Sequence, residues 1–84
     1  MAPKDSTAAF VKALGTVLRA ERQRLGLSQE ELCHRAELDR TYLSGLERGT
    51  RTPNLRTLMR LAAALKVKLS RLVLAAEALH DAPR

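Results

Sequence analysis

Residues 28–49 read SQEELCHRAELDRTYLSGLERG, and this stretch decides the fold that the sequence predicts. Ser28 and Glu31 have the spacing of a capping box, in which the serine side chain accepts a hydrogen bond from the helix backbone and the glutamate accepts one from the serine backbone. Apolar residues follow on one side at the spacing of a helix. The pattern predicts a short helix over residues 29–36.

A second short helix follows almost at once. Asp39 is its expected N-cap, residues 40–48 form it, and Gly49 ends it. Because only residues 37–39 separate the two helices, the chain must turn sharply between them instead of forming an antiparallel hairpin. Leu38 is expected to fill the corner. The stretch therefore predicts a helix-turn-helix.

The outer face of this second helix is polar or small. Leu43 and Leu46 are expected to face the core. The residues left outside near the start of the helix are then Arg40, Thr41, Tyr42, Ser44 and Gly45. A helix that enters the major groove of DNA needs such a face, because base edges are read by hydrogen bonds and a bulky side chain would block the approach. Arg40 stands where the helix dipole disfavours a cation, which favours a functional role for it.

The remaining sequence completes an all-α architecture. Helices are expected over about residues 7–25, over residues 55–65 and over about residues 69–80. The middle one of these, capped by Asn54, is expected to bury one apolar stripe: Leu55, Leu58, Met59, Ala62 and Leu65. The 84 residues are enough for one domain and too few for two, so residues 1–84 predict a single compact domain of five helices.

The charge of the chain indicates the kind of partner. Fifteen lysines and arginines stand against nine acidic residues, which gives a net charge of +6. A basic field of this size attracts polyanions, either nucleic acid or an acidic membrane surface. Solvated helix faces are the alternative explanation, and composition alone does not decide between the two.

Other function classes have little support in the sequence. It shows no paired carboxylates, no nucleophile with a histidine and no phosphate-binding loop, so we expect no enzyme, no cofactor and no small-molecule ligand. His34 and His80 are isolated, so no metal site is expected. No apolar run approaches the roughly 20 residues of a membrane span, the first residues lack a signal-peptide pattern, and the single Cys33 fits a reducing compartment. We expect a cytoplasmic protein, without a membrane partner, that reaches the nucleoid by binding DNA.

Four stretches together resemble a known family. They are residues 26–32 (GLSQEEL), 38–49 (LDRTYLSGLERG), 53–55 (PNL) and 61–67 (LAAALKV). In this order and spacing they resemble the phage-repressor (Cro/C1, or Xre) helix-turn-helix family over about residues 14–73. The second stretch most resembles the controller proteins of restriction–modification systems, which are small homodimers that regulate their own gene and the endonuclease gene.

The resemblance implies a DNA-binding region over about residues 14–73, with the motif at residues 29–48. It implies contacts to base edges from the start of the second helix of the motif, to which we add the outward serine: Arg40, Thr41, Tyr42 and Ser44. It implies contacts to the DNA backbone or minor groove from a wider set: Ser28, Gln29, Arg48, Arg51, Asn54, Arg56 and Thr57. For Tyr42 and Arg51, the alternatives are a plain surface tyrosine and a solvated loop arginine.

Other matched positions have structural roles in the family. Arg22 and Glu47 match a charged pair that ties the first helix to the third, which would keep a free carboxylate away from DNA phosphates. Glu37 and Lys66 stand where the family often has glycine, at the turn of the motif and at the end of the fourth helix. A glutamate held at positive φ in the turn is expected to cost about 1 kcal/mol.

The resemblance implies a transcriptional regulator that binds an inverted-repeat operator as a homodimer. One recognition helix covers only a few base pairs, so two copies with their helices about 34 Å apart are expected to act together. The dimer contact is expected from residues 74–84, which hold the end of the last helix and the tail, because a monomer has no use for the second apolar face of this helix, and two further candidates lie on the helix over residues 55–65. These interface candidates are Leu61, Leu65, Leu74, Ala75 and Leu79.

A controller of a restriction–modification system is the favoured role. The alternatives are a prophage or mobile-element repressor, an antitoxin that binds a toxin as well as DNA, and a nonspecific basic binder of nucleic acid or membrane surfaces. RNA polymerase would be a further partner if the protein activates transcription, with Glu30 and Glu31 as weak candidates for the contact. The sequence leaves the operator and the sign of regulation open.

Overall fold

The computed structural model describes residues 7–83. This part of the chain forms helices and no strands, as the sequence predicts. The helices are α1 (Thr7–Arg24), α2 (Gln29–Ala36), α3 (Arg40–Arg48), α4 (Leu55–Ala64) and α5 (Leu69–His80). The predicted bounds of α2 and α3 are confirmed, and α1 ends one residue earlier than expected.

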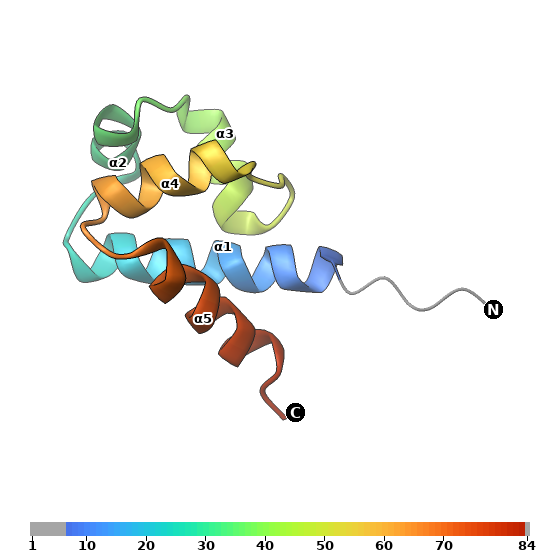
Figure 1. Cartoon of the computed structure of the whole chain (residues 1–84). Coiled ribbons are helices and arrows are strands. Elements are labelled where there is room, and N and C mark those ends of the chain that lie inside the picture. Colours follow the sequence, from blue (N-terminus) through green and yellow to red (C-terminus); the bar gives the residue numbers. More distant parts are fainter. Residues whose placement is uncertain (1–6, 84) are drawn as a thin grey trace.

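The long helix α1 runs through the middle of the molecule. Helices α2, α3 and α4 lie on one side of it, and α5 crosses it on the other side (Figure 1). Helix α1 packs against α3 and α5, while α2 packs against α3 and α4. The core between them consists mainly of leucines, of which the fully buried ones are Leu18, Leu32, Leu43, Leu46, Leu61, Leu65 and Leu72. The motif helices α2 and α3 are therefore held from behind by α1 and α4.

The helix ends follow the caps that the sequence predicts. Ser28 and Glu31 form both hydrogen bonds of the capping box at the start of α2. Asp39 caps α3 by accepting a hydrogen bond from the Tyr42 backbone N–H at 3.2 Å. Glu37 and Lys66 adopt the left-handed conformation, with φ of 55° and 59°. Both positions where the family often has glycine thus do require a positive φ here, and both carry side chains that disfavour it.

Helix α4 turns toward the core differently from the prediction. Leu55 and Met59, expected inside, are 63% and 56% exposed, whereas Leu61 and Leu65, proposed for a dimer contact, are fully buried. Those two buried leucines therefore cannot form a surface contact. The error arises because α4 is apolar around much of its circumference, so that two stripes have helical spacing. The stripe that faces the core is Leu58, Leu61, Ala62 and Leu65.

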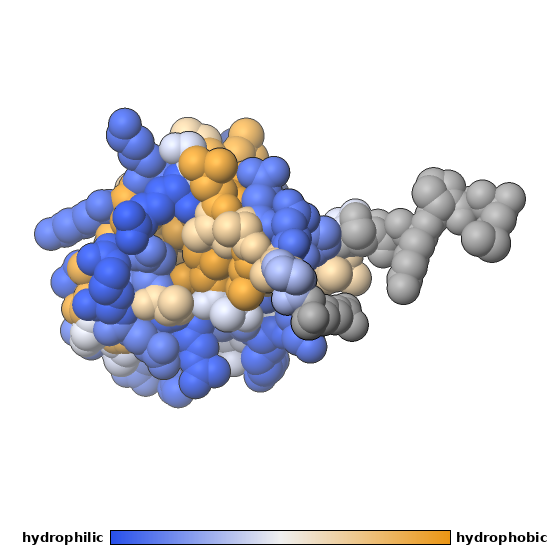
Figure 2. Space-filling model, turned by 90° about the horizontal axis from the view of Figure 1, so that it is seen from below, coloured by the Kyte–Doolittle hydropathy of each residue, from blue (hydrophilic) through white to orange (hydrophobic). Residues whose placement is uncertain are grey.

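Helix α5 offers a broad apolar arc that is made partly of small residues. Leu74 and Leu79 are 63% and 46% exposed, and Ala75 is half-buried against the core. Because a helix turns about 100° per residue, two positions five residues apart lie roughly 140° apart around its axis. Seen from the side on which α5 lies in Figure 1, apolar residues gather in the middle of the surface between hydrophilic ones (Figure 2). Ala75 and Ala78 lie between the two leucines around the axis, so the arc is continuous but shallow between its ends.

A buried carboxylate joins α1 to α5. The Glu21 side chain accepts hydrogen bonds from Arg24 Nε at 2.8 Å and from Arg71 Nε at 3.1 Å. Burial would raise the pKa of Glu21, but the hydrogen bonds and charges of the two arginines outweigh it, so that the pKa lies below its ordinary value. The ionised carboxylate is therefore the form that the fold stabilises.

Candidate nucleic-acid interface

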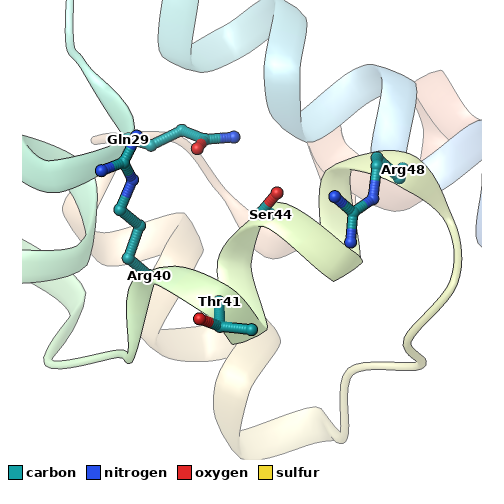
Figure 3. A pocket seen from close by; sticks show the side chains of 5 residues that line it. All are labelled: Gln29, Arg40, Thr41, Ser44 and Arg48. Atoms are coloured by element: carbon teal, nitrogen blue, oxygen red, sulfur yellow. The ribbon is translucent and has the colours of Figure 1, made fainter.

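The polar face of α3 and the start of α2 together line a shallow hollow on the surface. The hollow has a volume of about 360 Å³. Figure 3 shows the side chains that line it, which are Gln29, Arg40, Thr41, Ser44 and Arg48. All five were predicted from the sequence as DNA-contacting residues, three for bases and two for the backbone. The structure brings them together on one face, with the buried Leu43 and Leu46 on the opposite side of α3.

Arg40 is fixed only loosely within this face. Its Nη1 atom lies 3.2 Å from Glu30 Oε1, and the two side chains are 64% and 75% exposed. An ion pair between two exposed side chains is weak, so the guanidinium remains available to another partner. In Figure 3 the Arg40 side chain extends from the start of α3 toward α2. The Glu30 contact was not predicted, because it depends on the angle between the two helices.

A buried network lies behind this face and joins α1, α2 and α3. Arg22 donates from Nε to Glu47 Oε2 at 2.7 Å and from Nη2 to Oε1 at 3.0 Å. Gln29 Nε2 donates to the same Oε1 at 3.1 Å, and Arg22 Nη1 donates to the Leu27 carbonyl at 2.8 Å. The hydrogen bond to Glu47 raises the pKa of Arg22 despite partial burial. The charged pair expected from the sequence is therefore present, and Gln29 extends it to α2.

Tyr42, on α3, contacts Arg51 of the loop that follows this helix. The guanidinium carbon of Arg51 lies 5.2 Å from the centre of the Tyr42 ring, a cation–π geometry. Tyr42 is half-buried and packs against the core, whereas the sequence predicted an outward side chain that touches bases. Arg51 is exposed, in the loop after α3. Neither residue belongs to the hollow of Figure 3.

The remaining predicted backbone contacts differ in how accessible they are. Ser28 and Asn54 are exposed, but their side chains already accept hydrogen bonds as the N-caps of α2 and α4. Thr57 is only 8% exposed, so its side chain faces the fold and not a phosphate. Its backbone N–H donates to Asn54 Oδ1 at 2.8 Å, so Thr57 offers little free surface to a phosphate. Arg56 is exposed and borders an apolar surface on α4.

This apolar surface was missed by the sequence analysis. We call it the α4 stripe: Leu55, Met59 and Ala63, spaced four residues apart on one side of the helix. Arg56 and Arg60 border it, and the five residues line an open hollow of about 540 Å³. The spacing was visible in the sequence, but a second apolar stripe on the same helix competed with it. Large exposed apolar residues that share one face indicate an interaction surface.

Among residues 7–83, no group of three or more histidine, cysteine, aspartate or glutamate side chains is placed to hold a metal ion. None of the helices formed by these residues combines the length and apolarity needed to cross a membrane.

Comparisons with known sequences identify relatives over most of the chain. A family model described as helix-turn-helix matches residues 18–72. An uncharacterized HTH-type transcriptional regulator of Sinorhizobium fredii is 44% identical over 62 residues, which cover 74% of this chain and 80% of that protein. The immunity repressor of Bacillus phage phi105 is 37% identical over 60 residues, which cover 71% of this chain and 42% of the repressor.

A solved structure extends the comparison to the fold. The restriction-modification controller protein C.AhdI from Aeromonas hydrophila superposes with a TM-score of 0.75 at 41% identity, covering 76% of this chain and 97% of that one. The region matched by the family model, residues 18–72, includes α2, α3 and α4 and parts of α1 and α5. The chain therefore belongs to the Cro/C1-type helix-turn-helix family.

Proposed function

We propose that this protein is a transcriptional regulator that binds duplex DNA in a sequence-specific manner. One observation carries the proposal: polar side chains from α2 and α3 converge on one exposed face, and a buried charged network fixes the two helices behind it. The net charge of +6 supplies the attraction to a polyanion. Such a role would place the protein in the cytoplasm, at the nucleoid.

The side chains of this face suit different parts of the duplex. Arg40 can donate two hydrogen bonds to O6 and N7 of guanine, a contact that discriminates between bases by about 1–3 kcal/mol. Thr41 and Ser44 suit a thymine methyl group or a base-edge hydrogen bond. Gln29 and Arg48, at the two ends of the face, suit phosphates, which fix position without reading sequence.

A homodimer on an inverted repeat is the assembly that this geometry favours. The α4 stripe supports it, because its three residues share one side of the helix and are not covered within the described chain. The stripe begins at Leu55, just after the loop that follows α3. The proposal requires a two-fold axis there that leaves both copies of α3 on one side of the dimer, about 34 Å apart, where they can enter major grooves. Arg56 and Arg60 could cover the contact with their aliphatic stems.

The α5 side is the alternative dimer contact. Leu74, Ala75 and Leu79 were predicted for it, and apolar residues do gather on that side (Figure 2). Between Leu74 and Leu79 the apolar arc of α5 offers only small alanine side chains. The α4 stripe instead places two large exposed side chains, Leu55 and Met59, one turn apart. We therefore assign the two-fold contact to the α4 stripe.

Control of a restriction–modification system is the proposed biological role. The similarity to C.AhdI supports it, because the alignment spans 97% of that controller protein at 41% identity. The similarity to the phage phi105 immunity repressor favours a prophage repressor as the second candidate. The neighbouring genes distinguish them: an endonuclease or methyltransferase gene supports the first role and phage genes the second. RNA polymerase is a further partner if the regulator activates transcription.

The test of DNA reading is selection of bound duplexes from a random double-stranded pool at physiological salt. The proposal predicts enrichment of an inverted repeat whose half-sites are about one helical turn apart. A pool that stays random after repeated rounds would contradict sequence-specific binding. It would favour a nonspecific binder or a protein-binding role such as that of an antitoxin.

A further inference from the structure

Arg51 is held against α3 at two points although it lies in a loop. Its guanidinium group lies over the Tyr42 ring, with 5.2 Å between the guanidinium carbon and the ring centre. Its aliphatic stem lies over Gly45: a Cβ atom built on this glycine would collide with Arg51 Cγ and would lie 3.4 Å from Arg51 Cβ. The side chain is thus placed by one residue under its stem and another under its charged end.

The loop backbone is folded onto the same glycine. The Gly45 carbonyl accepts hydrogen bonds from the Thr50 backbone N–H at 2.9 Å, from the Arg51 backbone N–H at 3.3 Å and from Thr50 Oγ1 at 3.2 Å. Arg51 therefore begins from a fixed backbone position directly beside α3. The bond from Thr50, with that from the Gly49 N–H to the Leu46 carbonyl at 3.1 Å, is the Schellman motif that ends α3, so the helix end itself brings Arg51 to this place.

The presence of glycine at position 45 calls for a reason. Glycine in the middle of a helix is less stable than alanine by about 0.5–1 kcal/mol. Gly45 has no positive φ that would require it, since the positive-φ glycines are Gly26 and Gly49. The space that it leaves is occupied by the Arg51 stem. Room for this side chain is therefore the reason that the structure gives.

We propose that Gly45 and Tyr42 are positioning residues that hold Arg51 ready for a DNA phosphate or minor-groove edge. The inference rests on the proposed function and deepens it, because it assigns Tyr42 a role through Arg51 and not through a base. A long arginine side chain loses conformational entropy when a contact fixes it. Holding Arg51 in place before binding would reduce that loss at the moment of contact.

The ring and the hydroxyl group of Tyr42 have separable roles in this proposal. The face of an aromatic ring attracts a cation whether or not the ring carries a hydroxyl group. Tyr42→Phe is thus expected to preserve the position of Arg51, whereas Tyr42→Leu removes the ring and retains an apolar side chain toward the core. A base contact through the hydroxyl group would instead make Tyr42→Phe as damaging as Tyr42→Leu.

The first measurement uses the free protein. In NMR spectra, the Arg51 side-chain protons of the wild type and of Tyr42→Phe should show the ring-current shift of a group above an aromatic face. The shift should be lost in Tyr42→Leu and reduced in Gly45→Ala, which displaces the stem. Thermal unfolding of each variant verifies that it is folded. An Arg51 side chain without a ring-current shift in the wild type would overturn the proposal.

The second measurement is a double-mutant cycle of affinity for the selected duplex. Tyr42→Leu should weaken binding about threefold in the wild type, the size expected for a cation–π contact, and should have no further effect in Arg51→Ala. Gly45→Ala should follow the same pattern. The matched control is Arg48→Ala, an exposed arginine that does not contact Tyr42 among the described interactions; its effect should add to that of Tyr42→Leu.

The outcomes distinguish the positioning role of Tyr42 and Gly45 from DNA reading itself. Equal losses in Tyr42→Phe and Tyr42→Leu, or additive losses of Tyr42→Leu and Arg51→Ala, would overturn the positioning role while leaving DNA reading intact. If the wild type selects no sequence at all, the proposed function fails. The NMR measurement on the free protein then still decides whether Tyr42 and Gly45 hold Arg51.

Discussion

The α3 face and the α4 stripe are both exposed, but they are built in opposite ways. The α3 face is polar and is supported from behind by the Arg22–Glu47–Gln29 network, which ties three helices together. The α4 stripe is apolar, and the residues on the opposite side of α4 are ordinary core leucines. A surface that reads base edges needs its helices held in a fixed relative position, whereas an apolar contact needs mainly area and shape. The difference in construction is what the two proposed roles require.

The largest expected effect concerns the support of the α3 face. Glu47→Ala leaves the Arg22 guanidinium, whose side chain is only 12% exposed, without its carboxylate partner. Breaking a buried ion pair in this way should lower the free energy of unfolding by about 3 kcal/mol. Urea denaturation measures the loss. Glu30→Ala is the matched control, because it breaks an ion pair between exposed side chains and should change stability little. Equal losses in the two variants would mean that the network is not the support we describe.

The next effect concerns the α4 stripe. Met59→Lys would bury a charge in the proposed two-fold contact, and should raise the dimer dissociation constant at least tenfold, or about 1.4 kcal/mol. Sedimentation equilibrium measures it. Leu74→Lys is the control on α5, since Leu74 is exposed to a similar extent as Met59, at 63% against 56%. Dissociation caused by Leu74→Lys and not by Met59→Lys would move the two-fold contact to the α5 side.

A smaller effect is expected at Glu21, which belongs to neither surface. Its folded-state pKa is lowered by Arg24 and Arg71, so its contribution to stability is present above the unfolded-state pKa and is lost as the pH falls through the folded-state value. Glu21→Gln should therefore cost about 1–2 kcal/mol at neutral pH, and the difference from the wild type should diminish as the pH falls through the folded-state pKa of Glu21. Denaturant titrations across this range follow it. A difference that grows as the pH falls would contradict the assigned direction.

The smallest effects compare the two turns beside these surfaces. Glu37 and Lys66 have nearly the same positive φ, one after α2 and one after α4. Glu37→Gly and Lys66→Gly should each raise the free energy of unfolding by about 1 kcal/mol or somewhat less, because glycine adopts this conformation without strain. Thermal unfolding of both variants checks the values. A loss of stability in either would show that its side chain makes a contribution larger than the strain.

The sequence predicted the polar surface far better than the apolar one. The capping box of Ser28 and the N-cap Asp39 are local signals, and they determined the bounds of α2 and α3. Within those bounds Leu43 and Leu46 define the inner side of α3, so Thr41 and Ser44 lie on the outer side. On α4, by contrast, apolar residues occupy two stripes, and only the packing of α2 and α5 around it shows that Leu61 lies inside and Met59 outside.

Contacts between elements were also beyond local signals. The Arg22–Glu47 pair was implied by the family resemblance, but the hydrogen bond from Gln29 to the same carboxylate depends on how α2 meets α3. The stacking of Arg51 on Tyr42 depends on the path of the loop after α3. Thr57 was assigned to phosphate binding from its place near a helix start, and its burial follows from the rotation of α4.

The proposed function requires that the exposed face of α3 reads base edges. Its most direct test is the binding specificity of Arg40→Ala, measured against every single base-pair change in the selected operator. We expect the variant to lose its preference at one position in each half-site, a guanine contacted by Arg40, and to keep its preferences elsewhere. An Arg40→Ala profile identical to that of the wild type at every position would contradict base reading by this face.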